Sequence, residues 1–208
     1  YVYDLQTVKA SISALQDLNN VERVFYAMKA NGHDAILDTV FEADMGFECV
    51  SPGELNAVVK RFPTIDPKRL LYTPNFAQKS DYQVGFDVGA FVTLDNLFVL
   101  EHWGELLRGR SVFLRVDPGQ GQGHHEHVKT AGNQSKFGIP LFELERASEL
   151  AAEVECRVIG IHAHSGSGIT KPDSWSEVAD ILAAAARWFP DVETLDLGGG
   201  LGIPEKPG

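Results

Sequence analysis

The sequence predicts an α/β fold built on a parallel sheet, and three observations support this prediction. Short runs of β-branched and aromatic residues alternate with amphipathic runs of helical period along the whole chain. Turn residues (Gly, Pro, Asn and Asp) separate the two kinds of run. Unusual polar residues follow the strand-like runs, as in parallel folds whose sites lie at the carboxyl ends of the strands. Seven strand units are one short of a (β/α)8 barrel, so we expect an incomplete TIM-like barrel of about seven βα units.

Length and composition indicate a single globular domain over residues 1–208. With 44% hydrophobic and 23% charged residues, the 208-residue chain is long enough to bury a substantial core. Its 18 Lys and Arg residues against 29 Asp and Glu residues give a net charge of −11, which argues against a nucleic-acid partner or an anionic membrane surface. The longest apolar run, 181–186, is too short to span a bilayer.

The two cysteines, Cys49 and Cys156, each lie in an apolar strand-like run. This placement predicts two free core thiols and a reducing, cytoplasmic compartment. No CxxC pair or Cys/His cluster with zinc spacing occurs, so no metal site is expected. The chain opens on the strand-like residues 1–3 and stops just after the Gly-rich residues 198–208, and we therefore expect a piece of a longer protein.

The expected strands are short apolar runs that end in turn or polar residues. We expect the first, which ends at Lys29, to be buried on both faces, because it is a run of apolar and aromatic residues, and we expect the last to be a buried strand. In chain order the expected strands are 24–29, 46–51, 69–73, 90–93, 111–116, 156–162 and 193–197.

The expected helices carry apolar residues three and four positions apart. Thr7 is the expected N-cap of the first helix, and Ser51-Pro52-Gly53-Glu54 has the capping-box pattern with proline at the first helical position. In chain order the expected helices are 7–18, 33–41, 52–61, 76–85, 97–107, 141–153 and 173–189.

Lys29 is the first candidate site residue. An amine at the carboxyl end of a strand, desolvated by its neighbours, can lose its proton near neutral pH and attack a carbonyl group. The alternative is an ordinary lysine at a strand end that points into solvent. Glu48, Arg115 and His164 follow or end other strands of the same sheet and support the first interpretation.

The triple glycine Gly198-Gly199-Gly200 follows the last strand and is a candidate phosphate site, because its backbone N–H groups are open to an anion. A tight turn that needs positive φ is the alternative, but it explains one glycine better than three. The run 162–168 combines His-x-His with a Ser/Gly loop. There we expect His164 to stack on a planar cofactor and Ser167 to donate to a phosphate, whereas His162 is more typical of a core histidine bonded to backbone.

The long stretch 117–138 lacks a helical or strand pattern and is either a lid over an anionic substrate or a solvated insertion. It contains three histidines and a group of four residues that we assign to a substrate loop. These four are Lys129, Thr130, Ser135 and Lys136.

Five segments together resemble the fold type III, alanine-racemase-like amino acid decarboxylases that use pyridoxal 5′-phosphate, and among them the diaminopimelate decarboxylases. The resemblance extends over nearly the whole chain. The segments are 26–31 (YAMKAN), 48–54 (ECVSPGE), 129–138 (KTAGNQSKFG), 162–167 (HAHSGS) and 196–200 (DLGGG).

The resemblance implies roles for individual residues. Lys29 corresponds to the lysine that binds the cofactor aldehyde, and His164 to the residue stacked on the pyridine ring, so both are expected to be catalytic. Ser167 with 198–200 corresponds to the phosphate site, and Arg115 to an arginine near the cofactor. Glu48 stands where many members have Asp, and its role is left open.

The resemblance also implies an activity and a missing part. It implies decarboxylation of meso-2,6-diaminopimelate to L-lysine and CO₂ in a homodimer. A Glu-Pro-Gly-Arg segment and a C-terminal β-domain of the family are absent from this sequence, so we expect the 208 residues alone to be inactive. The alternatives are a decarboxylase for ornithine, arginine or carboxynorspermidine, a racemase, or a non-catalytic protein that binds pyridoxal phosphate.

Overall fold

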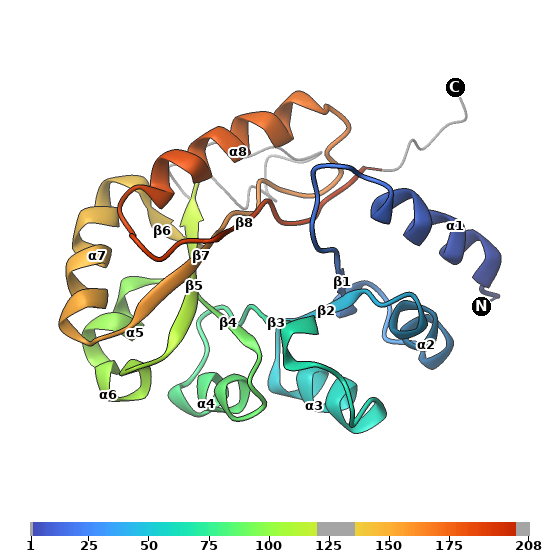
Figure 1. Cartoon of the computed structure of the whole chain (residues 1–208), viewed down its shortest axis with the longest axis horizontal. Coiled ribbons are helices and arrows are strands. Elements are labelled where there is room, and N and C mark those ends of the chain that lie inside the picture. Colours follow the sequence, from blue (N-terminus) through green and yellow to red (C-terminus); the bar gives the residue numbers. More distant parts are fainter. Residues whose placement is uncertain (1, 120–135, 203–208) are drawn as a thin grey trace. The chain divides into compact units, whose positions relative to one another are not determined.

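A computed structural model describes residues 2–119 and 136–202, in which helices and strands alternate along the chain (Figure 1). Three short 3-10 helices, labelled η, lie among them. The elements are α1 (Leu5–Gln16), β1 (Phe25–Ala27), η1 (Met28–Ala30), α2 (Asp34–Glu42), β2 (Gly46–Cys49), α3 (Pro52–Arg61), η2 (Pro67–Arg69), β3 (Leu70–Tyr72), α4 (Lys79–Asp87), β4 (Phe91–Leu94), α5 (Leu97–His102), α6 (Gly104–Leu107), β5 (Ser111–Asp117), β6 (Ile139–Pro140), η4 (Leu141–Glu143), α7 (Leu144–Glu153), β7 (Arg157–His162), α8 (Asp173–Ala186) and β8 (Thr194–Asp196).

The strands pair in parallel in the order β1-β2-β3-β4-β5-β7-β8, with β6 paired to β5 beside this path. Chain order and strand order agree, and helices connect consecutive strands, as in the wall of a (β/α)8 barrel. The expected incomplete barrel with seven strands on its path is therefore confirmed. The two-residue strand β6 directly follows the stretch 117–138 and was not among the expected strands.

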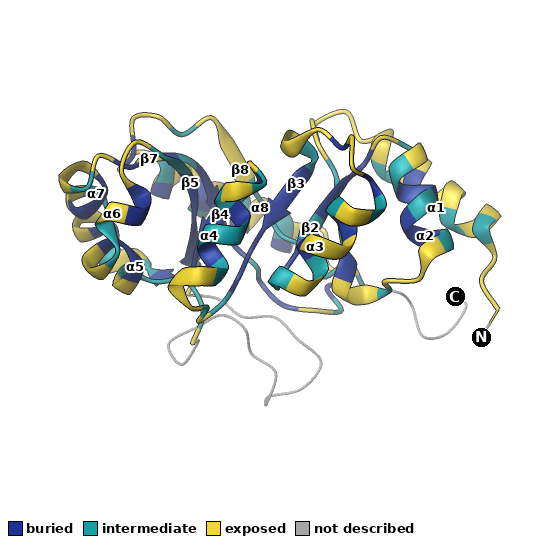
Figure 2. Cartoon of the chain, turned by 90° about the horizontal axis from the view of Figure 1, so that it is seen from below, coloured by how far each residue is buried: buried dark blue, intermediate teal, exposed yellow. Residues whose placement is uncertain are grey.

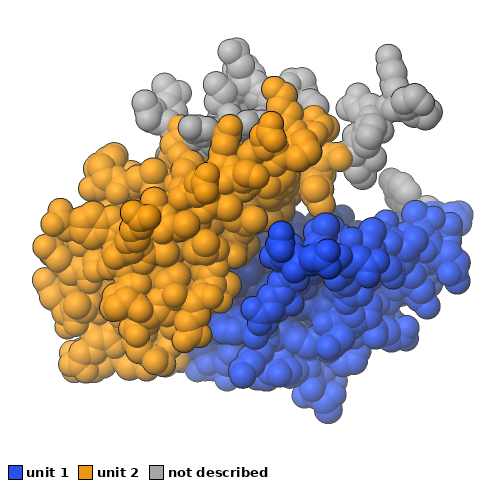
Figure 3. Space-filling view, turned by 45° about the horizontal axis from the view of Figure 1, so that its top comes forward, with its two compact units in different colours: residues 1–74, 80–92 blue, residues 75–79, 93–208 orange. Residues whose placement is uncertain are grey.

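The chain divides into two compact units, which are coloured separately in Figure 3. The first unit comprises residues 1–74 and 80–92 and contains β1 to β3 with helices α1 to α4. Its core includes the fully buried side chains of Phe47, Leu55, Tyr72 and Tyr82. Close packing there requires glycine at position 85, because a Cβ atom would lie 2.5 Å from the ring of Tyr72.

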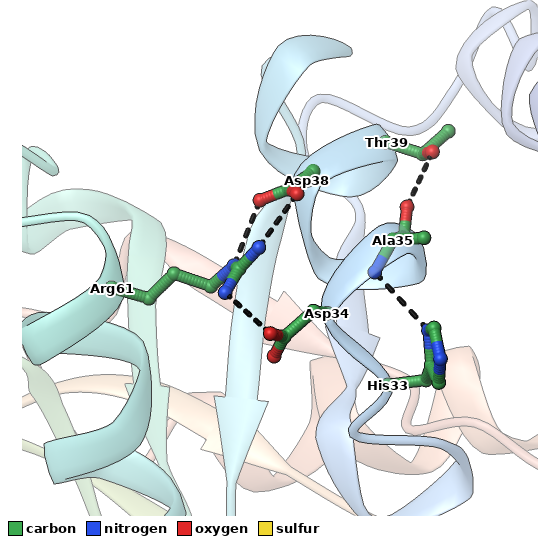
Figure 4. A network of polar contacts seen from close by, with 6 residues as sticks. All are labelled: His33, Asp34, Ala35, Asp38, Thr39 and Arg61. Carbon is green, nitrogen blue, oxygen red and sulfur yellow. Dashed lines mark hydrogen bonds and ion pairs between the residues drawn. The ribbon is translucent and has the colours of Figure 1, made fainter.

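An arginine clamp joins α2 to α3 in the first unit (Figure 4). The guanidinium of Arg61 donates two hydrogen bonds to Asp38, 2.8 Å to Oδ1 and 2.6 Å to Oδ2, and its Nη1 lies 3.0 Å from Asp34. These bidentate bonds from Arg61 lower the pKa of the Asp38 carboxyl. The side chain at the end of α3 therefore ties this helix to the preceding one.

The second unit comprises residues 75–79 and 93–208, of which the described part contains β5 to β8 and α5 to α8. Leu114, Ile139, Ile161 and Leu182 are fully buried in its core. Buried residues concentrate on the strands and on one side of the helices, as the blue segments in Figure 2 show. The expected helix 97–107 is two helices, broken at Trp103 and Gly104.

Several element ends differ from the sequence prediction for local reasons. Asp4, not Thr7, is the N-cap of α1, because its carboxylate accepts from the N–H of Gln6 at 2.9 Å and also from the hydroxyl of Thr7. The capping box at α3 is confirmed: Ser51 Oγ accepts from the N–H of Glu54, and the Glu54 carboxylate accepts from the N–H of Val50. Helix α4 begins at Lys79, three residues later than expected.

The first and last strands are less buried than predicted. All three residues of β1 are half-buried, and Thr194 and Leu195 of β8 are exposed. The prediction of a first strand buried on both faces and of a buried last strand was wrong, because each of them pairs with only one neighbour among the described residues. Both cysteines are free and buried, as predicted. No helix in the described ranges is long and apolar enough to cross a membrane.

Candidate active site

Lys29 lies just beyond β1, in the 3-10 turn η1, and not in the strand itself. Its side chain is 59% exposed, and its Nζ atom lies 3.9 Å from Oε2 of Glu48. The prediction of a desolvated amine at the strand end was therefore wrong in both respects. The turn carries Lys29 out of the half-buried strand, where water reaches it and an acidic partner faces it.

Glu48 has a second polar partner, Thr73, which the sequence pattern did not reveal. It lies in β2 with its side chain 14% exposed, and its Oε1 accepts a hydrogen bond from the hydroxyl of Thr73. Thr73 is buried and directly follows β3, and its N–H donates to the carbonyl of Cys49 at 2.9 Å. A polar residue at the end of a buried strand was the available signal for Thr73.

Arg115 ends up buried near the carboxyl end of β5, with 7% of its surface exposed. Its Nη1 donates to Oδ1 of Asn75 at 2.6 Å, and its guanidinium carbon lies 4.9 Å from the ring centroid of Phe137. Phe137 belongs to the Lys-Phe-Gly segment, so one of the segments that support the resemblance lies against Arg115. Stacking on an aromatic ring and a short hydrogen bond fix the orientation of this buried cation.

The buried His162 and the half-buried Asp196 form a pair at the carboxyl ends of β7 and β8. The Nδ1 atom of His162 lies 2.9 Å from Oδ2 of Asp196, and the two residues are register partners in the sheet. Burial alone would raise the pKa of Asp196, but the neighbouring His162, together with the N–H of Gly198, more than offsets burial and lowers it. His162 is a core histidine as predicted, but its partner is a carboxylate and not the backbone.

The triple glycine lies against the Ser/Gly loop that follows β7. Gly198 and Gly200 have φ values of +70° and +95°, and a Cβ atom on Gly200 would lie only 2.0 Å from the carbonyl oxygen of Gly166. The N–H of Ile169 donates to the carbonyl of Gly200 at 2.8 Å, which ties the two loops together. Only glycine permits this backbone approach.

One glycine amide is already used within the protein. The N–H of Gly198 donates to Oδ1 of Asp196 at 2.8 Å. Contrary to the expectation, this N–H is therefore not open to an anion. A Cβ atom on Gly199, in contrast, would meet nothing within 4 Å. The open part of this loop therefore begins at Gly199.

The site residues predicted from the sequence are divided between the two units. Lys29 and Glu48 meet in the first unit, and the second contains Arg115, His164, Ser167 and 198–200. His164 is half-buried, and Ser167 is exposed. Lys129, Thr130 and Ser135 of the substrate loop lie outside the described residues, whereas the Nζ of Lys136 lies 5.1 Å from the ring centroid of Phe137.

A comparison with protein families decides the family of the chain. Residues 5–207 match the family described as pyridoxal-dependent decarboxylase, pyridoxal binding domain. The chain belongs to this family. Pyridoxal phosphate is accordingly the cofactor that the residues described above have to accommodate.

Two similar proteins are both named diaminopimelate decarboxylase. The chain is 36% identical over 192 residues to a diaminopimelate decarboxylase of Methanothermobacter thermautotrophicus, a match that covers 89% of this chain and 44% of the relative. It is 27% identical over 210 residues to the diaminopimelate decarboxylase of Escherichia coli K12, covering 100% of this chain and 49% of that protein. The chain thus spans about half the length of the relatives it matches.

Solved structures agree on the fold. A crystal structure of a diaminopimelate decarboxylase superposes with a TM-score of 0.87 at 27% identity, over 99% of this chain and 49% of the other. The Helicobacter pylori diaminopimelate decarboxylase complexed with L-lysine gives 0.86 at 20% identity, over 99% and 55%. At that identity the second likeness supports the fold alone.

The residues in place suit the cofactor. An exposed lysine is accessible to the aldehyde of pyridoxal phosphate, and its acidic neighbour Glu48 accompanies it. The loop at Gly199 leaves space where a side chain would otherwise project, as close approach of a phosphate to backbone amides requires. The lysine of the first unit thus suits the aldehyde of the cofactor, and the glycine loop of the second unit suits its phosphate.

Proposed function

We propose that this chain forms the cofactor-binding part of a decarboxylase that converts meso-2,6-diaminopimelate to L-lysine and CO₂. The observation that supports the substrate is the 36% identity, over 89% of this chain, to a protein named diaminopimelate decarboxylase. A structure of the same name at 27% identity and a TM-score of 0.87 adds to this support.

We assign the following roles. Lys29 binds the cofactor aldehyde covalently, and Glu48 is the acidic group beside its amine. His164 stacks on the cofactor ring, and Arg115 is the fixed cation near it. Ser167 and the glycine loop 198–200 hold the phosphate, where Gly198 contributes shape and the open amides begin at Gly199.

When bound, pyridoxal phosphate supplies the electron-accepting ring that makes loss of CO₂ from an amino acid possible. The protein supplies binding, orientation and charge. Asp196 and the backbone bonds between the two glycine loops hold the phosphate site in one shape before the ligand arrives. Lys129, Thr130, Ser135 and Lys136 are proposed to contact the amino acid substrate.

Two experiments on the natural full-length protein test this proposal. Borohydride reduction in the presence of pyridoxal phosphate, followed by peptide mapping, should label Lys29, and an unlabelled Lys29 would exclude the assigned role. Release of CO₂ should be fastest from meso-2,6-diaminopimelate in a panel that also contains arginine, ornithine and lysine. An arginine decarboxylase of similar fold, at 25% identity and a TM-score of 0.78, makes arginine the main competitor in that panel.

We further propose that the full-length protein is a cytoplasmic homodimer. Two buried free thiols suit a reducing compartment, and the net charge of −11 suits a soluble biosynthetic enzyme. Light scattering of the full-length protein should give twice the mass of one chain. The 208 residues produced alone should release no CO₂, and robust turnover by them would contradict the proposed need for the remainder.

A further inference from the structure

A hydroxyl, a carboxylate and an amine form a line across three neighbouring strands of the first unit. Thr73 follows β3, Glu48 lies in β2, and Lys29 follows β1. The hydroxyl of Thr73 donates to Oε1 of Glu48, and Oε2 of Glu48 lies 3.9 Å from Nζ of Lys29. The two carboxylate oxygens therefore have different neighbours, one a buried hydroxyl and the other the candidate reactive amine.

We propose that Thr73 is a positioning residue that fixes the Glu48 carboxylate so that its second oxygen faces Lys29. This inference rests on the proposed function, because it assumes that Lys29 reacts with the cofactor aldehyde. Thr73 is hydrogen-bonded to Glu48 and acts through this carboxylate.

Burial and connectivity make Thr73 suitable for this task. It is 5% exposed, and the bond from its N–H to the Cys49 carbonyl ties it to the strand that carries Glu48. Lys29 is 59% exposed at one end of the line, whereas the side chain of Glu48 in its middle is only 14% exposed. A glutamate has three rotatable side-chain bonds, so its carboxylate keeps one orientation only where a second group holds it.

A comparison with Thr39, another buried threonine, shows that the hydrogen bond from Thr73 to Glu48 is not the usual local bond of a threonine hydroxyl. Thr39 donates its hydroxyl to the carbonyl of Ala35, one turn back in its own helix, which is the usual local partner of a threonine. The Thr73 hydroxyl instead donates to an acidic side chain 25 residues away in sequence. Bonds to charged acceptors are among the stronger hydrogen bonds, so this one can orient the group it reaches.

The reaction that reports on this arrangement is attachment of the cofactor. The Nζ of Lys29 forms a bond to the aldehyde carbon of pyridoxal phosphate, the aldehyde oxygen leaves as water, and no electrons are gained or lost. Its rate depends on the group beside the amine. Affinity for pyridoxamine phosphate does not depend on this reaction, because that molecule has the phosphate and the ring but no aldehyde.

The experiment compares Thr73→Val, which keeps the shape and removes the hydroxyl, with Thr73→Ser, which keeps the hydroxyl, in the full-length protein freed of cofactor. Attachment is followed by the visible absorbance that appears on mixing with pyridoxal phosphate. We expect Thr73→Val to slow attachment about tenfold and Thr73→Ser to stay within about twofold of wild type. Affinity for pyridoxamine phosphate should be unchanged in both. Thr64→Val, the same change at an exposed position, is the control.

A double-mutant cycle separates positioning from a general structural effect. Once Glu48→Gln is present, adding Thr73→Val should cause little further slowing, since the hydroxyl acts through the carboxylate. Equal slowing in both backgrounds, wild-type attachment by Thr73→Val, or a parallel loss of pyridoxamine phosphate affinity would each overturn the inference while Lys29 still reacts. If wild-type Lys29 itself does not react, the proposed function fails, and this inference fails with it.

Discussion

Asp196 connects His162 to the glycine loop through its two carboxylate oxygens. Oδ2 lies 2.9 Å from Nδ1 of His162, and Oδ1 accepts the N–H of Gly198 at 2.8 Å. The histidine ends β7, and the loop begins two residues after β8. A single half-buried carboxylate therefore sets where the loop leaves its strand, and the first predictions concern its loss.

Replacing Asp196 with Asn should destabilise the protein by about 1–3 kcal/mol, because a buried histidine loses its charged partner while the shape is kept. The same change should weaken binding of pyridoxamine phosphate, since the loop that starts at Gly198 loses its anchor. Urea denaturation and equilibrium titration of the full-length protein measure the two effects. Asp191→Asn, an identical change at an exposed position, should alter neither.

The contribution of Asp196 should also depend on pH in a defined direction. Its folded-state pKa is lowered from the ordinary value of 3.8, so its stabilising effect is present above that value and is lost as pH falls through the lower, folded-state pKa. The difference in free energy of unfolding between wild type and Asp196→Asn should shrink as the pH falls below about 4. A difference that instead grows on acidification would contradict the assigned direction.

Substitution by alanine should destabilise the protein much more at Gly200 than at Gly199. Gly200→Ala places a methyl group on a backbone with φ of +95° and 2.0 Å from the Gly166 carbonyl oxygen, so the loops must separate. We expect a loss of at least about 2 kcal/mol in the free energy of unfolding. Gly199→Ala meets nothing within 4 Å and should stay within about 1 kcal/mol of wild type, although its methyl group should hinder phosphate binding. Equal destabilisation by both would refute the close packing of the loops.

Arg61→Lys should lower the thermal midpoint of the full-length protein, because a lysine cannot reproduce the two parallel hydrogen bonds to Asp38 or reach Asp34 at the same time. The effect should decrease when the pH is brought below the lowered pKa of Asp38, since the protonated carboxyl no longer attracts the cation. Arg108→Lys, at an exposed position, provides the matched control by differential scanning calorimetry.

Local chemistry in the sequence explains why the fold class and most helices were predicted. The capping box at Ser51 and Glu54 acts within four residues, so its pattern is readable without tertiary information. The start of α1 was misplaced because aspartate and threonine are both good caps, and Asp4 and Thr7 bond each other there. The need for glycine at position 104, where α6 begins, has a tertiary cause, since a Cβ atom there would lie 2.6 Å from Val154, 50 residues away.

The sequence predicted which residues belong to the candidate site, but it did not predict the contacts that they make. Lys29, Glu48 and the glycine loop were found because polar residues and glycines follow strands. The exposure of Lys29 was not, because a three-residue 3-10 turn follows β1 and moves the lysine out of the strand. Thr73 was missed because Glu48, the residue that it holds, lies 25 residues away in sequence.

By itself, the sequence determined the alternation of strands and helices and the residue types at the strand ends, because periodicity, caps and turn residues act over a few positions. Only the tertiary structure decided which of those residues meet: Thr73 with Glu48, and His162 with Asp196. The physical reason is strand register. In parallel strands, partners that are 25 to 34 residues apart in sequence become neighbours only once the sheet has formed.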